Sequence, residues 1–258
     1  MDEQPQISNA DVFEDDFFAS LYDSLNSWSA CDDFYLARAV DSGGPVLNLG
    51  CGTGVLACAI AAKGIGVTAV DPSAAMLRVA RSCPGADKVQ WIESDGQGLR
   101  LPQRFRFIYM TGHAFQQLMT DEAAVDLLRA AAAHLDPEGQ FVFETRNPAF
   151  QAWLSWTPER SQRTVQSPQH GRISLFYDAQ HDAQTGIVTI REHYDLLDQQ
   201  VQRVGINRIR FIDQDHLSRL LKEAGLTAVA WYGDWYGNPF SPSSREMIVA
   251  TRRNESTA

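Results

Sequence analysis

Residues 46–54, VLNLGCGTG, give the strongest indication of the fold class in this sequence. Three glycines, Gly50, Gly52 and Gly54, follow directly on a short apolar run. Glycine weakens a strand, but it allows tight turns in which the backbone approaches another group without a Cβ in the way. An apolar strand, a glycine-rich turn and the helix-like run VLACAIAAKG are typical of a sheet that binds a ligand beyond its strand ends.

Strand-like and helix-like runs alternate on the C-terminal side of this stretch. We predict strands in residues 45–50, 66–71, 89–95, 104–110, 140–148, 226–235 and 245–253. We predict helices in residues 55–64, 72–83, 120–139 and 213–225, with Ser73 and Asp213 as N-caps. Strands separated by helices indicate a parallel sheet that is covered on both faces. The sequence therefore predicts an α/β fold, a doubly wound Rossmann-like sheet.

Residues 151–212 differ from this alternation. Three β-rich runs, RISLFYDAQ, GIVTIREHYDLL and QRVGINRIRFI, are separated by short polar segments. This pattern predicts an antiparallel β insert after the fifth strand. The core domain is then expected to comprise residues 45–150 and 213–253.

Composition narrows the class of protein. The chain has 258 residues, 44% of them hydrophobic, which is enough for one large domain. The net charge of −10 argues against a broad phosphate-binding face, so we expect no nucleic-acid partner. No apolar run reaches the roughly 18 residues that span a membrane, and the acidic N-terminus lacks the features of a signal peptide. The four cysteines show neither metal-binding spacing nor a disulfide framework, so we expect no metal and a cytoplasmic location.

Two further turns indicate what the glycines approach. The second strand ends in Asp71, and a carboxylate at that place suits the hydroxyls of a ribose. The third strand ends in the turn ESDGQGL, where Asp95 can accept from an adenine amino group and the amides of Gly96 and Gln97 can donate to ring nitrogens. The glycines are spaced G-x-G-x-G, whereas a dinucleotide site has G-x-G-x-x-G. We therefore predict a nucleoside ligand that is not a dinucleotide.

The ordered elements VLNLGCGTG, VTAVDPS, WIESDGQGL, FIYMTGHAFQQL and GQFVFETRNP resemble the class I S-adenosylmethionine-dependent methyltransferases, small-molecule branch, over about residues 17–253. The resemblance implies a seven-stranded sheet of order 3-2-1-4-5-7-6 with strand seven antiparallel. It implies that an N-terminal helical segment, residues 1–44, closes over the cofactor and that the insert covers the substrate. The implied cofactor-binding residues are Tyr22, Gly50, Cys51, Gly52, Gly54, Asp71, Pro72, Met76, Asp95, Gly96, Gln97 and Met110. Asn48 departs from the acidic residue usual in the family at this position.

The acceptor side is less defined. His113, after the fourth strand, is the candidate catalytic base, although it could equally stack on the cofactor or anchor its loop. Arg146 could pair with a substrate carboxylate or with Glu144. His193 and Tyr194, in the insert, could line the lid or pack the sheet. Each of Trp153, Trp156, Trp231 and Trp235 could belong to the core or to the rim of the site.

Three functions are compatible with these residues. The first is N- or O-methylation of a small molecule by in-line transfer, for which the protein mainly aligns the reactants and excludes water. The second is methylation of tRNA or protein, which the acidic charge disfavours. The third is cofactor binding without catalysis, which the intact glycine, ribose and adenine elements disfavour. We expect a monomer or a homodimer.

Overall fold

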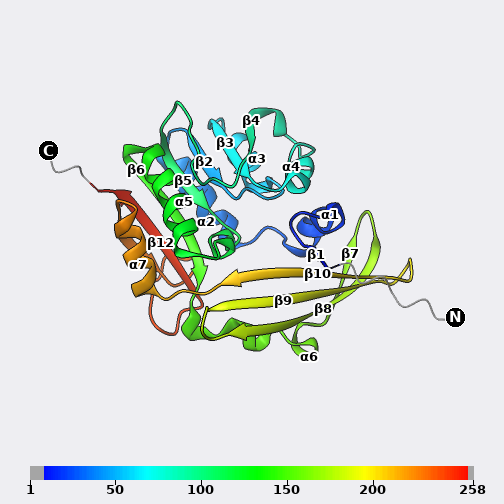
Figure 1. The fold of residues 1–258 in the computed structure, drawn as a ribbon. Coiled ribbons are helices and arrows are strands. Elements are labelled where there is room, and N and C mark those ends of the chain that lie inside the picture. Colours follow the sequence, from blue (N-terminus) through cyan, green and yellow to red (C-terminus); the bar gives the residue numbers. More distant parts are fainter. Residues whose placement is uncertain (1–8, 255–258) are drawn as a thin grey trace.

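Seven strands form the main sheet of the computed structural model, which describes residues 9–254. Their spatial order is β11-β12-β6-β5-β2-β3-β4 (Figure 1). The bounds are β2 (Val46–Leu49), β3 (Val67–Asp71), β4 (Val89–Glu93), β5 (Phe105–Met110), β6 (Leu135–Arg146), β11 (Leu226–Tyr232) and β12 (Glu246–Arg253). Strands β4, β3, β2, β5 and β6 are parallel to one another, and β12 is antiparallel to both of its neighbours. This confirms the predicted doubly wound sheet of order 3-2-1-4-5-7-6.

Helices cover both faces of this sheet. On one face, α2 (Ala30–Ser42) and α3 (Val55–Ala61) pack against the sheet, and on the other face α5 (Asp121–His134) and α7 (Gln214–Glu223) do so. Every residue of β2 and β3 is buried, because these central strands contact helices on both sides. Parallel strands place their carboxyl ends at one edge, so the turns after β2, β3 and β5 lie next to one another.

The helix boundaries follow local capping chemistry. Ser73 begins α4 (Ala74–Ala80) by accepting a hydrogen bond from the amide of Met76 at 3.0 Å. Asp213 begins α7 by accepting from the amide of His216 at 2.7 Å. Both caps were predicted from the sequence. The predicted helix 120–139 is shorter in the structure, since β6 already begins at Leu135.

A second sheet has the order β1-β10-β9-β8-β7 (Figure 1). Its strands are β1 (Asn9–Asp11), β7 (Arg163–Ser167), β8 (Gly171–Asp182), β9 (Ile187–Leu196) and β10 (Val201–Arg210). Strands β7 to β10 form an antiparallel meander, as predicted for the insert. The short helices η3 (Pro148–Phe150), η4 (Ala152–Ser155) and α6 (Pro158–Ser161) connect β6 to this meander. Strand β1 pairs in parallel with β10, which the sequence did not predict.

Helix α1 (Asp16–Leu25) lies between the two sheets (Figure 1). Phe18 and Leu21 pack with Ile173 and Leu175 of the insert, and Ala19 packs against α4. The predicted N-terminal segment 1–44 is therefore helical in α1 and α2, but it also contributes a strand. Its first eight residues lie outside the described part of the chain. None of the helices in residues 9–254 combines the length and the apolar character that a membrane span needs.

Candidate active site

The glycine turn follows β2 and adopts backbone conformations that favour glycine. Gly50, Gly52 and Gly54 have φ angles of 69°, 54° and 75°. A Cβ on Gly50 would lie 2.9 Å from the Cβ of Ala114, and one on Gly54 would lie 2.4 Å from the ring of Trp91. No described atom lies within 4 Å of the place that a Cβ on Gly52 would occupy. The backbone at Gly52 therefore has open space beside it, where a ligand can approach.

Asp71 connects the end of β3 to the glycine turn. Its Oδ2 accepts from the amide of Gly52 at 2.7 Å, and its Oδ1 accepts from the amide of Ser73 at 2.9 Å. Burial raises the pKa of Asp71, and these two hydrogen bonds oppose the rise. Asp71 is not the cap of α4, because Ser73 has that role. Each carboxylate oxygen can accept a further hydrogen bond, so Asp71 fits a ligand with two adjacent hydroxyls.

Of the residues predicted to bind the adenine, some are exposed and others are buried. Pro72 and Asp95 are exposed, and Asp95 accepts from the amide of Gln97 at 2.9 Å. Gly96 is buried, and its Cβ position would lie 3.0 Å from Leu127. Met76 is only 2% exposed and packs with Ala19 and Ala75. The structure thus places Met76 in the core, whereas Pro72 and Asp95 are open to a ligand.

Helix α1 is hydrogen-bonded to the glycine turn, and the segment just before it is hydrogen-bonded to Ser73, the N-cap of α4. Asp23 accepts a hydrogen bond from the hydroxyl of Thr53 at 2.5 Å, and the carbonyl of Phe13 accepts from the hydroxyl of Ser73 at 2.5 Å. Tyr22, in the same helix, has its hydroxyl 3.3 Å from the Cβ position of Gly112. Burial raises the pKa of Tyr22 to about 12, with further contributions from Asp23 and Asp71. Tyr22 therefore presents a neutral hydroxyl beside the turn after β5.

Glu144 organises the turn after β5. It is fully buried, and it accepts from the hydroxyl of Tyr35 and, at 2.8 Å, from the amide of His113. Burial raises the pKa of Glu144, and the neighbouring His113 opposes the rise. The hydroxyl of Tyr35 also lies 3.4 Å from the carbonyl of Met110. Glu144 therefore does not form the ion pair with Arg146 that the sequence left open.

Asn48, the departure from the family pattern, donates to the carbonyl of Tyr109 at 3.5 Å.

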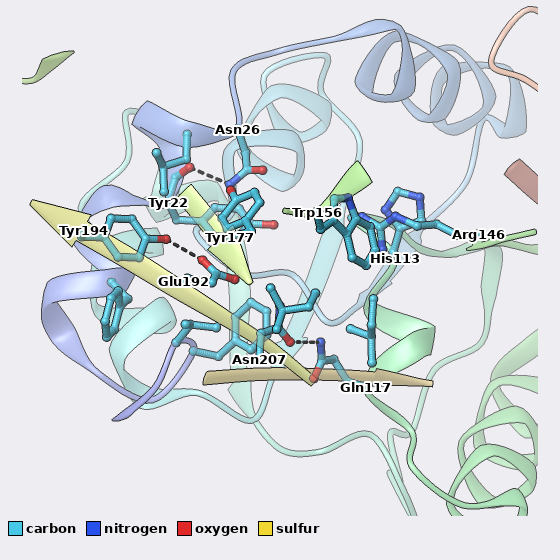
Figure 2. A pocket seen from close by; sticks show the side chains of 17 residues that line it. Tyr22, Asn26, His113, Gln117, Arg146, Trp156, Tyr177, Glu192, Tyr194 and Asn207 are labelled. Carbon is cyan, nitrogen blue, oxygen red and sulfur yellow. Dashed lines mark hydrogen bonds between the residues drawn. The ribbon is translucent and has the colours of Figure 1, made fainter. Parts of the chain in front are cut away.

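A cavity of about 200 Å³ lies between the strand ends, α1 and the second sheet (Figure 2). His113 and Gly112 come from the turn after β5, Arg146 from the end of β6, and Tyr22 from α1. The other lining residues are Val12, Phe13, Phe18, Leu25, Asn26, Gln117, Trp156, Tyr177, Ile190, Glu192, Tyr194, Asn207 and Ile209. The cavity is therefore built jointly by the core and the insert.

His113 lies in the cavity wall at the start of η2 (Ala114–Gln117), in a left-handed backbone conformation with φ 59°. Its Nε2 is 2.8 Å from Oε2 of Glu246, at the start of β12. Burial alone would raise the pKa of Glu246, but the contact with His113 and the charge of Arg146 outweigh it and lower that pKa. A carboxylate beside Nε2 favours the tautomer with the proton on Nε2, which leaves Nδ1 as the basic nitrogen.

Arg146 also lies in the wall, with its own partners already in place. It donates to Oε1 of Gln116 at 2.8 Å, and its guanidinium lies 5.4 Å from the ring centre of Trp156. Burial lowers the pKa of Arg146, while the carboxylates of Glu246 and Glu144 oppose this. The same three side chains, His113, Arg146 and Trp156, line a second hollow of about 290 Å³ beside Arg245.

Of the two insert residues predicted to contact the substrate, one lines the cavity and the other does not, and the insert adds lining residues that were not predicted. Tyr194 lines the cavity, whereas His193 is on the other face of β9 and stacks on Phe176 at 4.4 Å. Side chains alternate along a strand, so Ile190, Glu192 and Tyr194 share the cavity face. Glu192 and Asn207 of the insert and Gln117 of η2 were not predicted. Glu192 could have been predicted, because it lies between Ile190 and Tyr194 at every second position of the strand.

The four tryptophans have different environments. Trp156 belongs to the cavity wall, and Trp153 packs inside the insert, 4.7 Å from the ring of Phe211. Trp231 and Trp235 pack against the hydrophobic clusters on the two faces of the main sheet. Cys51 packs against the cluster that contains Cys58, and both are free thiols.

Comparisons with known proteins agree with this geometry. A family model described as a methyltransferase domain matches residues 46–139. The chain is 28% identical to the cypemycin N-terminal methyltransferase of a Streptomyces species, over 82% of this chain and 84% of that protein. It is 33% identical to the ubiquinone biosynthesis O-methyltransferase of Azotobacter vinelandii, over 44% of this chain and 49% of that protein.

Solved structures show the same fold. The CcbJ methyltransferase from Streptomyces caelestis superposes with a TM-score of 0.78 at 22% identity, covering 96% of this chain and all (100%) of that chain. The amino pentose methyltransferase CalS10 from Micromonospora echinaspora, solved with S-adenosylmethionine bound, gives a TM-score of 0.69 at 19% identity, covering 98% and 100%.

Proposed function

We propose that the chain is a class I S-adenosylmethionine-dependent methyltransferase, and that it methylates a small molecule held in the cavity between its strand ends and its insert. The observation that carries this proposal is the joint origin of the cavity wall. Gly112, His113 and Arg146 come from the edge where the family binds its cofactor, and Tyr194 comes from the insert. A cavity of about 200 Å³ suits a compact acceptor more than a macromolecular surface.

The residues at the strand ends fit the cofactor. The turn at Gly50, Cys51, Gly52 and Gly54 would face its methionine part, and Asp71 would accept from the ribose hydroxyls. Pro72 and the amides of Gly96 and Gln97, with Asp95, would face the adenine, and Tyr22 would cover the sulfonium side. The backbone carbonyl of Met110 would accept a hydrogen bond from the amino group of the cofactor. Because Met76 is buried, it would support the adenine-binding surface from behind without contacting the adenine.

When bound, S-adenosylmethionine supplies a methyl group that its sulfonium already activates. The residues of the chain then have to align the acceptor, exclude water and receive a proton. We propose that His113 receives this proton at Nδ1, because Glu246 lies beside its other ring nitrogen. Arg146 and Tyr194 would orient the acceptor from opposite walls, and the insert would exclude water. Because His193 stacks on the far face of the sheet, we do not assign it a contact with the acceptor.

The printed names of the relatives do not fix the acceptor, since they include an N-terminal methyltransferase, an O-methyltransferase and an amino pentose methyltransferase. Transfer to tRNA or protein remains the alternative. A cytoplasmic location, and a monomeric or homodimeric state, remain part of the proposal.

Labelled S-adenosylmethionine separates these alternatives. The chain is incubated with a metabolite extract, with bulk tRNA and with bulk protein, and the label is followed by mass spectrometry. We expect label in a product of low molecular mass, and less of it with His113→Asn. Label confined to tRNA or protein would contradict the proposal.

A further inference from the structure

Glu192 is an acidic side chain on an otherwise largely apolar and aromatic cavity face. It lies in the middle of β9, opposite Tyr177 in β8 and Gly205 in β10. Its neighbours along the same strand face, Ile190 and Tyr194, also line the cavity. Figure 2 shows its carboxylate directed toward the space between Tyr177, Tyr194 and Asn207. The pattern of the strand therefore places one carboxylate inside the acceptor cavity.

The hydrogen-bond partners of Glu192 are neutral. The hydroxyl of Tyr194 donates to its Oε2 at 2.5 Å, and the neutral side chain of Asn207 lies close enough to lower the pKa of the carboxyl. The carbonyl oxygen of Asn207 in turn accepts from the amide of Gln117 at 3.1 Å, which orients the Asn207 amino group (Figure 2). This network fixes the carboxylate in place, but it supplies no positive charge.

The nearby cations are engaged elsewhere. Among residues 9–254, no lysine, arginine or histidine forms an ion pair with Glu192. Arg146, across the cavity, donates to Gln116, and Arg163 donates to the hydroxyl of Tyr177 at 2.7 Å. Burial raises the pKa of Glu192, and its polar neighbours and the charge of Arg163 oppose this rise without cancelling it. A carboxylate in such a place is stabilised when a ligand brings the missing cation.

The rest of the cavity also suits a cation. The rings of Phe18, Tyr22, Trp156 and Tyr177 line it, and aromatic faces attract an ammonium group. An alcohol acceptor would give Glu192 one more neutral donor and would leave its charge unbalanced. An amine acceptor can bind as an ammonium, or can take the proton from a protonated Glu192, and both routes give the same ion pair.

We propose that Glu192 is the specificity-determining residue for an amino group, so that the acceptor is an amine and the reaction is N-methylation; this rests on the proposed function of the cavity. One N–H of the bound ammonium donates to Glu192, and a second proton passes to Nδ1 of His113. The nitrogen lone pair that is freed forms the N–C bond. The pair of the broken S–C bond stays on sulfur, and the methylated product leaves as an ammonium.

The test compares two probes of one shape, cyclohexylamine and cyclohexanol, by calorimetry with S-adenosylhomocysteine present. In the wild-type chain we expect the amine to bind at least 10-fold more tightly than the alcohol. In Glu192→Gln, which keeps the shape of the side chain, amine affinity should fall about 10- to 100-fold, as loss of a charge-assisted hydrogen bond predicts. The control is Asp178→Asn, on the outer face of the same sheet, which should retain the preference.

Equal binding of the two probes by the wild-type chain, no binding of either, or a preserved amine preference in Glu192→Gln would each overturn the inference. Binding of S-adenosylhomocysteine to each variant, measured first, shows that the variant is folded. The wild-type comparison does not depend on any variant. Failure of the proposed function would be recognised by a different result, namely methyl transfer to macromolecules only.

Discussion

Asp71 is the carboxylate on which cofactor binding is expected to depend most. Its two oxygens already hold the amides of Gly52 and Ser73, so it both shapes the glycine turn and faces the ligand. Its two functions can be separated by comparing Asp71→Asn with Asp71→Ala, because asparagine keeps one acceptor oxygen and alanine keeps none.

For Asp71→Ala we expect the affinity for S-adenosylhomocysteine to fall about 10- to 100-fold, since a hydrogen bond to a charged group contributes about 1.5–3 kcal/mol. Asp71→Asn should lose less. Calorimetry measures both, and circular dichroism checks that the fold is retained. An unchanged affinity in Asp71→Ala would restrict this side chain to shaping the turn.

His113 and Glu246 are predicted to act as a pair. As a general base, His113 should contribute about 10²- to 10⁴-fold to the rate, so His113→Asn should lower kcat by that factor and remove the acidic limb of the pH–rate profile. Glu246→Gln should shift this limb and lower kcat less, because it changes only the partner of Nε2. If His113 only anchors its turn, kcat and cofactor affinity should decline together while the shape of the profile is kept.

Glu192 should make stability depend on pH in a defined direction. Burial raises its pKa in the folded chain above the value of about 4.3 in an unfolded chain. Between these two values the folded chain binds more protons than the unfolded chain, so its stability falls as the pH rises through this window. Glu192→Gln has no such charge. We therefore expect its Tm to exceed that of the wild type at pH 8, without any acceptor present, and the difference to shrink below about pH 4.

Differential scanning calorimetry at both pH values measures this effect, with Asp178→Asn as the control on the exposed face. A variant less stable than the wild type at pH 8 would mean that Tyr194 and Asn207 bind the carboxylate strongly enough to offset its burial.

Strand β1 and helix α1 connect the cofactor side of the molecule to the insert. Gly205 in β10 makes this contact possible, because a Cβ there would lie 2.4 Å from Val12 and 3.0 Å from the ring of Phe18. The boundary predicted at residues 151–212 is thus bridged by the N-terminal segment. Deletion of the whole insert would expose the face of α1 that carries Phe18 and Leu21, so a point substitution is the better probe.

Gly205→Ala should therefore displace the N-terminal segment and destabilise the fold by about 1–3 kcal/mol, as overpacking generally does. We expect a lower Tm, faster proteolysis within residues 9–25 and a weaker affinity for S-adenosylhomocysteine. Gly66→Ala is the control, because no described atom lies within 4 Å of that Cβ position. Identical behaviour of the two variants would show that this contact is unimportant.

The sequence predicted the elements well where their signals were local. Continuous apolar runs identified the buried strands, and three β-rich runs separated by short polar segments identified the insert. Strand β1 was missed because Asn-Ala-Asp has no strand preference, and its pairing with β10 depends on tertiary contacts. The helix predicted over residues 120–139 was too long, because Pro137 and Gly139 lie in the irregular first part of β6.

The whole molecule places its site where two sheets face each other, and this explains which parts of the site were predictable. Most of the candidate cofactor residues follow consecutive strands, and the ordered motifs together with the family resemblance that they carry were sufficient to propose them. The acceptor wall depends on the register of β8, β9 and β10, which decides that Glu192 and Tyr194 face the cavity while His193 does not. A shift by one residue would exchange these faces, and one sequence alone could not fix it.

Both proposals depend on where the cofactor lies relative to the cavity, and a crystal structure with S-adenosylhomocysteine would show this. We predict the ribose on Asp71, the adenine beside Pro72 and Asp95, and the homocysteine along the turn at Gly50–Gly54. We predict the sulfur beneath Tyr22, facing the cavity that His113 and Glu192 line. A sulfur atom that points away from this cavity, or a ligand bound at another edge of the sheet, would contradict both the proposed cofactor site and the proposed acceptor site.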